Sequence, residues 1–210
     1  MIRPKVVVLD YGSGNIHSVV NAFLNQGADV ELTADREKAL TCEGLVVPGV
    51  GSFPAVMKQL IDSGAPSILD QRLSAGKAVF GICVGLQVLF ESGNEHDVET
   101  AGLGQWPGTV TKLDSETLPH IGWNTIATAD GSILFDGIED ERFYFVHSYG
   151  AADFPLERET AFAKPKVSWG EYGSRFVAAV ENGPLSATQF HPEKSGEAGL
   201  RLISNWLKTL

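Results

Sequence analysis

Short apolar runs alternate with helix-like segments through the first half of the chain, and this alternation constrains the fold more than any other feature. The runs are rich in β-branched residues, as buried strands are, and they occupy residues 5–9, 28–33, 44–49 and 77–82. Apolar residues recur at helical spacing in the segments that follow them, which cover residues 14–27, 55–61, 67–75 and 84–92. Strand–helix–strand order of this kind predicts a parallel sheet with helices on both faces.

The second half changes character, because short strand-like runs follow one another with little helix between them. Some of these strands should therefore pair antiparallel, and the runs fall at residues 108–113, 141–149, 160–164 and 175–190. Glu181–Gly183 is typical of a hairpin turn. A final amphipathic helix is expected to have Ser195 as its N-cap. Because no repeat or linker interrupts the pattern, residues 1–210 are expected to form one α/β domain.

Composition disfavours several classes of function. The net charge of −10 argues against a nucleic-acid partner, because phosphate binding needs clustered Lys and Arg. No apolar stretch has the length of a membrane span, and residues 1–10 lack the features of a signal peptide. Two cysteines do not make a disulfide framework, so a cytoplasmic location is expected. The glycine-rich residues 10–15 match neither a dinucleotide fingerprint nor a P-loop, and no cofactor or metal is expected.

Cys83 follows the strand expected over residues 77–82, at the end where sites form in parallel sheets. Gly81 and Gly85 flank it with the spacing of a G-x-S-x-G nucleophile elbow. In such an elbow a sharp strand-to-helix turn exposes the nucleophile, and flanking side chains would clash with the neighbouring strand and helix. The helix start would favour the thiolate, and the N–H of Val84 would face an oxyanion. The alternative interpretation is an inert cysteine at a tight turn.

His191 is the best candidate for the base that a cysteine nucleophile needs. It ends an apolar run, and Pro192 favours an extended backbone at His191. Residues i and i+2 of an extended segment share a side, so Glu193 can accept the imidazole N–H and fix its tautomer. A surface turn before the last helix is the alternative. His147, at the end of another strand, is a second candidate for the base.

A further backbone donor for the oxyanion is expected from another strand end. Residues 46–53 read "VVPGVGSF", and Gly49 and Gly51 leave peptide N–H groups free to turn into a site. A plain strand-to-helix turn would explain the same residues.

With these segments assembled, the chain resembles the class I (triad) glutamine amidotransferases over essentially its full length. "PGVGSF", "GICVGLQ" and "QFHPEKS" are similar to the three defining segments of that family, in order and spacing. The resemblance implies a flavodoxin-like fold: a mixed, mostly parallel central sheet with helices on both faces and an antiparallel strand extension. It implies that Cys83 is the nucleophile, that His191 is the general base and acid, and that Glu193 orients His191. The implied oxyanion hole is the backbone of Val50, Gly51 and Val84, and the implied glutamine-binding residues are Gly49, Gln87, Ser148 and Tyr149.

Three more segments, "DYGSGN", "PHIGWN" and "YFVHSY", resemble the glutaminase subunits of imidazole glycerol phosphate synthases. In that family the subunit hydrolyses L-glutamine through a cysteine thioester. It passes ammonia to a (β/α)8 cyclase subunit, which makes imidazole glycerol phosphate and AICAR in histidine biosynthesis. The resemblance thus implies glutamine as substrate and a heterodimer with the cyclase, with a partner-facing side at Trp123, Asn124, Tyr144 and Lys194. Val84, Leu86 and Pro54 depart from the commoner residues of the family.

Three alternatives stay open on the sequence. The chain could be the glutaminase of another amidotransferase, such as the anthranilate or pyridoxal phosphate type, although "PHIGWN" argues against this. A stand-alone cysteine hydrolase of γ-glutamyl compounds would need no partner. A catalytically inactive binding module is disfavoured by the intact set of Cys, His and Glu.

Overall fold

A central sheet organises the computed structural model, which describes residues 3–14, 16–155 and 164–210. In this part of the chain the sheet has eight strands in the order β2-β1-β3-β4-β14-β13-β12-β9. The four apolar runs of the first half form its parallel strands: β1 (Lys5–Leu9), β2 (Asp29–Thr33), β3 (Gly44–Gly49) and β4 (Ala78–Cys83). A late strand, β14 (Leu185–Thr188), inserts beside β4 and runs parallel to it. The predicted parallel sheet is confirmed.

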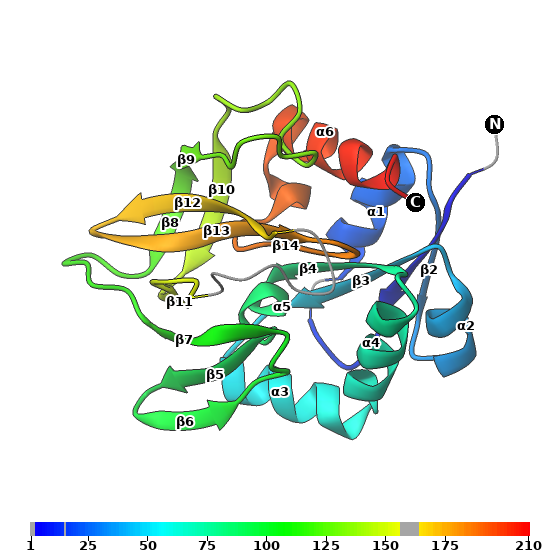
Figure 1. Ribbon diagram of the computed structural model, residues 1–210, viewed down its shortest axis with the longest axis horizontal. Helices are drawn as coiled ribbons and strands as arrows, with labels where there is room; N and C mark the ends of the chain where they lie inside the picture. The colour runs from blue at the N-terminus through cyan, green and yellow to red at the C-terminus, as the bar shows by residue number, and fades with distance from the viewer. Residues whose placement is uncertain (1–2, 15, 156–163) are drawn as a thin grey trace.

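Helices cover both faces of this sheet (Figure 1). One face carries α1 (His17–Asn25) and α6 (Gly196–Leu207), and the other carries α3 (Phe53–Asp62) and α4 (Ala65–Ser74). Phe80 of β4 packs against Trp206 of α6 with ring centroids 5.3 Å apart, and Phe23 of α1 lies 5.8 Å from the same indole. Each such buried side chain contributes about 1.5–3 kcal/mol to burial energy. This aromatic contact fixes α6, and hence the turn that leads into it, over β4.

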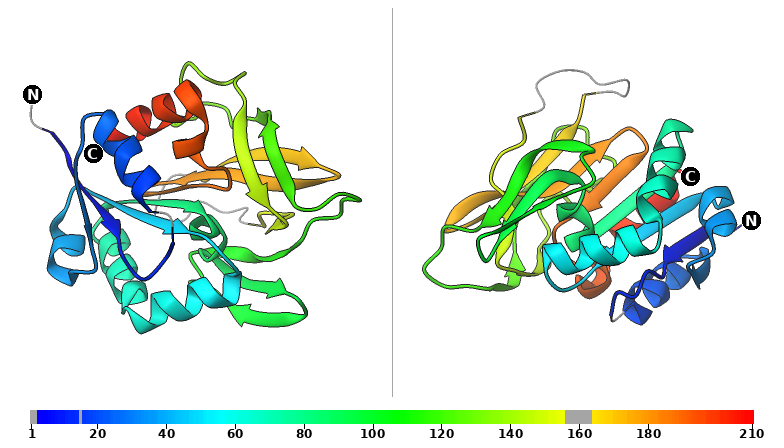
Figure 2. Two further views of the ribbon diagram at one scale, coloured as in Figure 1. Left: turned by 180° about the vertical axis from the view of Figure 1, so that it is seen from behind. Right: turned by 90° about the horizontal axis from the view of Figure 1, so that it is seen from below.

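The second half supplies the expected antiparallel extension. β13 (Ser174–Asn182) pairs with β14 through the predicted hairpin, in which Gly183 has φ +61°. β12 (Lys166–Tyr172) and β9 (Ile126–Ala127) continue the sheet outward. Two smaller sheets stand beside it (Figure 2), and they comprise β10 (Phe143–His147) with β8 (His120–Asn124), and β11 (Tyr149–Ala151), β7 (Trp106–Lys112), β5 (Phe90–Glu95) and β6 (Val98–Ala101).

The helix predicted over residues 84–92 is wrong in length. Helix α5 (Val84–Gln87) is a single turn, and β5 begins at Phe90. The ring of Phe90 packs on Trp106 of β7 at 5.6 Å, and the backbone at Gly93 lies so close to Phe53 that a Cβ there would sit 2.6 Å from the ring. These tertiary contacts therefore stabilise this apolar segment as a strand rather than as a helix.

Other differences are local. Ser195 is the N-cap residue of α6 as predicted, but its side chain makes no cap hydrogen bond, because its Oγ donates to the His191 carbonyl at 2.7 Å and accepts from the Tyr144 N–H at 2.9 Å. Helix α2 (Arg36–Thr41) was not predicted, although Asp35 caps it by accepting from Lys38 N at 2.8 Å. The strand predicted at residues 160–164 falls outside the described residues, apart from Lys164, which is not in a strand.

Candidate active site

Three neighbouring parallel strands end at one edge of the sheet, and each is followed by a candidate functional segment. β3 leads into Val50 and Gly51, β4 ends at Cys83, and β14 leads through Gln189 to His191. The registers place Gly49 opposite Cys83 and Thr188 opposite Ile82. Parallel pairing thus brings the predicted nucleophile, the predicted base and the glycine-rich segment to one place, as the rule for open α/β sheets predicts.

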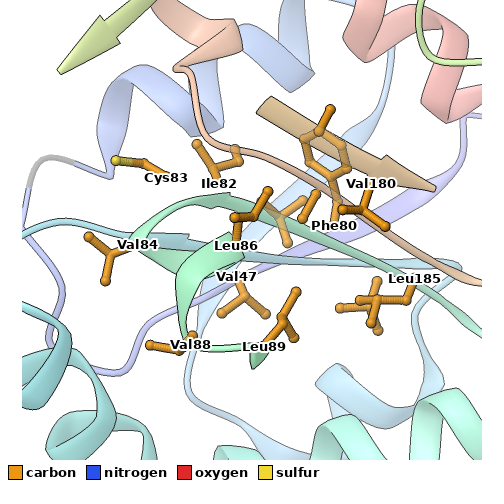
Figure 3. Packing of buried hydrophobic residues seen from close by; sticks show 14 of the residues in the cluster. Val47, Phe80, Ile82, Cys83, Val84, Leu86, Val88, Leu89, Val180 and Leu185 are labelled. Carbon is orange, nitrogen blue, oxygen red and sulfur yellow. The ribbon is translucent and has the colours of Figure 1, made fainter. Parts of the chain in front are cut away.

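The backbone at Cys83 has the strained geometry of a nucleophile elbow. Its φ is +58° and ψ −113°, a conformation that costs a non-glycine residue about 1–3 kcal/mol. A Cβ on Gly85 would lie 2.1 Å from the Val47 carbonyl oxygen, and one on Gly81 would lie 2.7 Å from the Gly85 carbonyl oxygen. The predicted reason for the two flanking glycines is therefore confirmed. Cys83 lies at the end of the apolar cluster that Ile82 and Leu86 continue inward (Figure 3), and it is 4% exposed.

His191 and Glu193 form a buried pair beside this cysteine. Nδ1 of His191 lies 2.8 Å from Oε1 of Glu193, and both side chains are almost fully buried. The backbone of His191 is extended, with φ −97° and ψ 98°, so the pair has the i, i+2 arrangement that was predicted. Burial lowers the pKa of His191, but the hydrogen bonds and charges of Cys83 and Glu193 outweigh it and raise that pKa to about 10. The arrangement therefore favours an imidazolium next to the sulfur.

A cleft of about 500 Å³ opens in front of Cys83. Gln87, Ser148 and Tyr149, three of the residues predicted to bind substrate, line it together with Gly51 and Val84. Gly49 is not among the residues lining this cleft, and a Cβ there would lie 2.4 Å from the Gly85 nitrogen. The absence of a side chain at Gly49 is thus explained by contact with the elbow.

Glu95 and Lys112 also line the cleft and were missed from the sequence. They come from β5 and β7, and only the first three residues of β5 fell in the predicted helix over residues 84–92. One oxygen of Glu95 accepts from the Phe53 N–H at 2.6 Å, which fixes the carboxylate at the start of α3. A carboxylate and an ammonium group therefore face the same cleft.

Tyr11 supports the glycine-rich segment from outside the cleft. Its buried phenol donates a hydrogen bond to the carbonyl of Pro48, directly before Gly49. Burial raises the pKa of Tyr11 to about 12, so the phenol stays protonated and keeps its donor. Gly51, further along this segment, has φ +106°, which favours glycine.

The second candidate base, His147, lies in a different environment. Its Nε2 faces Nδ1 of His120 at 3.0 Å, and its Nδ1 faces the Tyr149 carbonyl at 2.9 Å. Burial lowers the pKa of His147 to about 3 and that of His120 to about 4. Both rings are neutral, so His147 donates from Nδ1 to Tyr149 and accepts at Nε2 from His120. His191 is the better base.

The residues predicted to face a partner lie on three elements, namely β8, β10 and the short 3₁₀ helix Pro192–Lys194. Trp123 of β8 pairs with Tyr144 of β10, and their rings are 5.9 Å apart. The indole of Trp123 is 47% exposed. Lys194 lines a small hollow together with Val50 and His191. Asn124 differs from these, because its amide donates to the Glu171 carbonyl at 2.9 Å and is held within the chain.

Within the described part of the chain, no group of three or more His, Cys, Asp or Glu side chains could hold a metal ion. None of the helices in residues 3–14, 16–155 and 164–210 combines the length and the apolar character that crossing a bilayer requires.

Solved structures with a similar fold are distant in sequence. The chain aligns with "Structure of PurLQS from Thermotoga maritima" at a TM-score of 0.74 and 18% identity, covering 99% of each chain. A second match, titled "Crystal structure of glutamine amidotransferase", has the same TM-score and identity and covers 98% of this chain and 99% of the other. At this identity the comparison supports the flavodoxin-like amidotransferase fold alone.

Relatives at much higher identity carry one shared name. A protein of Leifsonia xyli named "Imidazole glycerol phosphate synthase subunit HisH" is 60% identical over 210 residues, which is 100% of both chains. A protein of Nocardia farcinica with the same name is 56% identical, again over the whole of both chains. The family model described as "Glutamine amidotransferase class-I" matches residues 7–210. With the elbow at Cys83 and the His191–Glu193 pair already in place beside a cleft, this match shows that the chain belongs to the class-I glutamine amidotransferases.

Proposed function

We propose that the chain is the glutaminase subunit of an imidazole glycerol phosphate synthase. Its full-length relatives at 52–60% identity carry that name. The observation that supports the chemistry is the buried pair of His191 and Glu193, 2.8 Å apart, beside the strained Cys83. The substrate is L-glutamine, the products are glutamate and ammonia, and the whole chain acts as one domain in the cytoplasm.

The reaction begins with attack of the Cys83 thiolate on the side-chain amide carbon of glutamine. The carbonyl π electrons move onto oxygen, and backbone N–H groups at Val50, Gly51 and Val84 stabilise that oxyanion. The oxyanion then collapses, the C–N bond breaks, and His191 gives its proton to the departing ammonia. A thioester remains on Cys83. Neutral His191 next takes a proton from water, whose oxygen attacks the thioester carbon and releases glutamate and the thiolate.

The opposite charges of the cleft suit the other end of the substrate. Glutamine carries an α-ammonium and an α-carboxylate, and Glu95 and Lys112 both line the cleft. We assign Glu95 to the ammonium and Lys112 to the carboxylate, with Ser148 and Tyr149 beside them. The carboxylate and the ammonium group in the cleft therefore favour a substrate with an α-amino-acid end over a simple amide.

The partner is a (β/α)8 cyclase that docks on the side marked by Trp123, Tyr144 and Lys194. Ammonia released into water at pH 7 becomes ammonium and ceases to be a nucleophile. An interface that closes the site off from solvent keeps the ammonia unprotonated until it reaches the cyclase. Ile121 and Trp123, at i and i+2 on one face of β8, are both exposed, and neighbouring exposed apolar side chains support an interaction surface there.

Glutaminase activity measured with and without the candidate cyclase tests the proposal. We expect co-purification of the two chains, a low rate for the chain alone, and a higher rate when the cyclase and its ligand are added. Complementation of a histidine auxotroph that lacks the glutaminase subunit separates this function from that of another amidotransferase. An equal rate with and without the cyclase would support the stand-alone hydrolase instead.

A further inference from the structure

Gln189 is a buried polar residue at the site that the mechanism above does not use. It follows β14, has no exposed surface, and precedes His191 by two residues. The ring of Phe190, between them, packs on Phe143 at 4.4 Å and on Phe145 at 5.5 Å. Residues 189 and 190 form a bend after β14, and the side chains of Gln189 and His191 both reach Cys83.

Hydrogen-bond contacts fix the orientation of two side-chain amides, first that of Gln87 and then that of Gln189. The Tyr149 carbonyl can only accept, and Nε2 of Gln87 lies 2.8 Å from it, so that atom is the donor nitrogen. The same nitrogen lies 3.0 Å from Oε1 of Gln189. If the Gln189 amide were turned over, two NH₂ groups would face each other. The carbonyl of Gln189 therefore points to Gln87, and its NH₂ group points the other way.

That NH₂ group reaches the cysteine. Nε2 of Gln189 lies 3.8 Å from Sγ of Cys83, within hydrogen-bond range for sulfur. The Val146 carbonyl lies 4.0 Å from the same sulfur and could accept only from a protonated thiol. A donor from Gln189 favours the thiolate, which accepts hydrogen bonds and donates none.

We propose that Gln189 is a further catalytic residue, whose side-chain N–H donates to the Cys83 sulfur and stabilises the thiolate beside His191. The Tyr149 carbonyl, through Gln87, holds the Gln189 amide in the donating orientation. The consequence for glutamine turnover depends on the proposed function, whereas the contact with sulfur can be tested without substrate.

The test is the pH dependence of Cys83 alkylation by iodoacetamide, followed by mass spectrometry of the Cys83 peptide. Gln189→Met keeps the length of the side chain but cannot donate. A hydrogen bond to a charged group shifts the titration midpoint of that group by about one to two pH units. The alkylation midpoint of Gln189→Met should therefore lie about one unit or more above that of the wild type. Gln189→Glu places negative charge against the sulfur, and its midpoint should rise further.

Asn205→Leu is the matched control. Asn205, which lies on α6 and does not line the cleft, is also a buried amide and donates to the carbonyls of Leu134 and Asp136. This variant should unfold more easily and keep the wild-type alkylation midpoint. In a folded Gln189→Met enzyme, glutaminase kcat should fall about tenfold with little change in KM, because the lost contact is to the nucleophile.

The alkylation experiment distinguishes the proposed role of Gln189 from the proposed glutaminase function. A raised alkylation midpoint supports the role of Gln189 even if the wild-type chain proves to have no glutaminase activity. A wild-type midpoint in either folded variant overturns it. If neither variant folds, Gln189 has a structural role and the proposal also fails.

Discussion

Two buried histidines of this site lie in different settings and differ in charge, since His191 is protonated and His147 is neutral. His191, 5% exposed, has Glu193 and Cys83 as partners, and its pKa is raised to about 10. His147, 6% exposed, has the neutral ring of His120 and a carbonyl as partners, and its pKa is lowered to about 3. Burial is nearly equal, so the partners decide the charge. One setting is suited to moving a proton, and the other to holding a fixed hydrogen-bond pattern.

The largest expected effect comes from removing the charged histidine. His191→Gln should lower the glutaminase rate by about 10⁴–10⁶-fold, as loss of one member of a catalytic triad does. His147→Asn, which can keep a donor toward the Tyr149 carbonyl, should lower it far less. Steady-state rates in the presence of the cyclase measure both. Equal losses in the two variants would show that the histidines do not differ in role.

A smaller effect should follow from neutralising Glu193. Glu193→Gln keeps an oxygen near Nδ1 of His191 but removes the charge, at a cost of about 1.5–3 kcal/mol, or about 10–100-fold in rate. The pKa of His191 should fall, because one of its two stabilising charges is gone. The basic limb of the pH–rate profile should then move to lower pH. An unmoved limb would mean that Cys83 alone holds the proton on His191.

The two settings should also give opposite slopes of stability against pH. The raised pKa of His191 contributes stability that is fully present below pH 6.5 and is lost as pH rises toward about 10. The lowered pKa values of His120 and His147 contribute stability that is present above pH 6.5 and is lost as pH falls toward about 4 and 3. Urea unfolding across this range, for the wild type and for His191→Gln, isolates the first slope. His147→Asn isolates the second.

The smallest effect is expected for the two neutral histidines, His120 and His147, and it concerns stability. His120→Leu leaves Nε2 of His147 without its donor and should cost about 1–3 kcal/mol in unfolding free energy. His120→Asn, whose amide can donate toward His147, should recover part of this loss. Thermal melting of the two variants compares them directly. If the two melt alike, the contact at 3.0 Å contributes nothing measurable to stability.

The neighbourhood of Cys83, His191 and Glu193 was predictable because each follows an apolar run that reads as a strand. Adjacent parallel strands then bring these ends together. Glu95, Lys112 and Gln189 were not predictable in the same way. The segment around Phe90 has apolar spacing that fits a helix, and its packing on Trp106 makes it a strand. The role of Gln189 depends on contacts with Cys83 and Gln87, which are distant in the sequence.

The parallel pairing of β14 with β4 has a consequence for the order in which the protein is made. Leu185 pairs with Val79, and everything between them must be synthesised before that ladder can form. A chain still growing on the ribosome therefore carries the Cys83 elbow long before it carries His191 and Glu193. Formation of contacts so far apart is a late and slow event in folding. Hydrolysis of glutamine thus begins only after His191 and Glu193 have been made, and a chain truncated before them cannot carry it out.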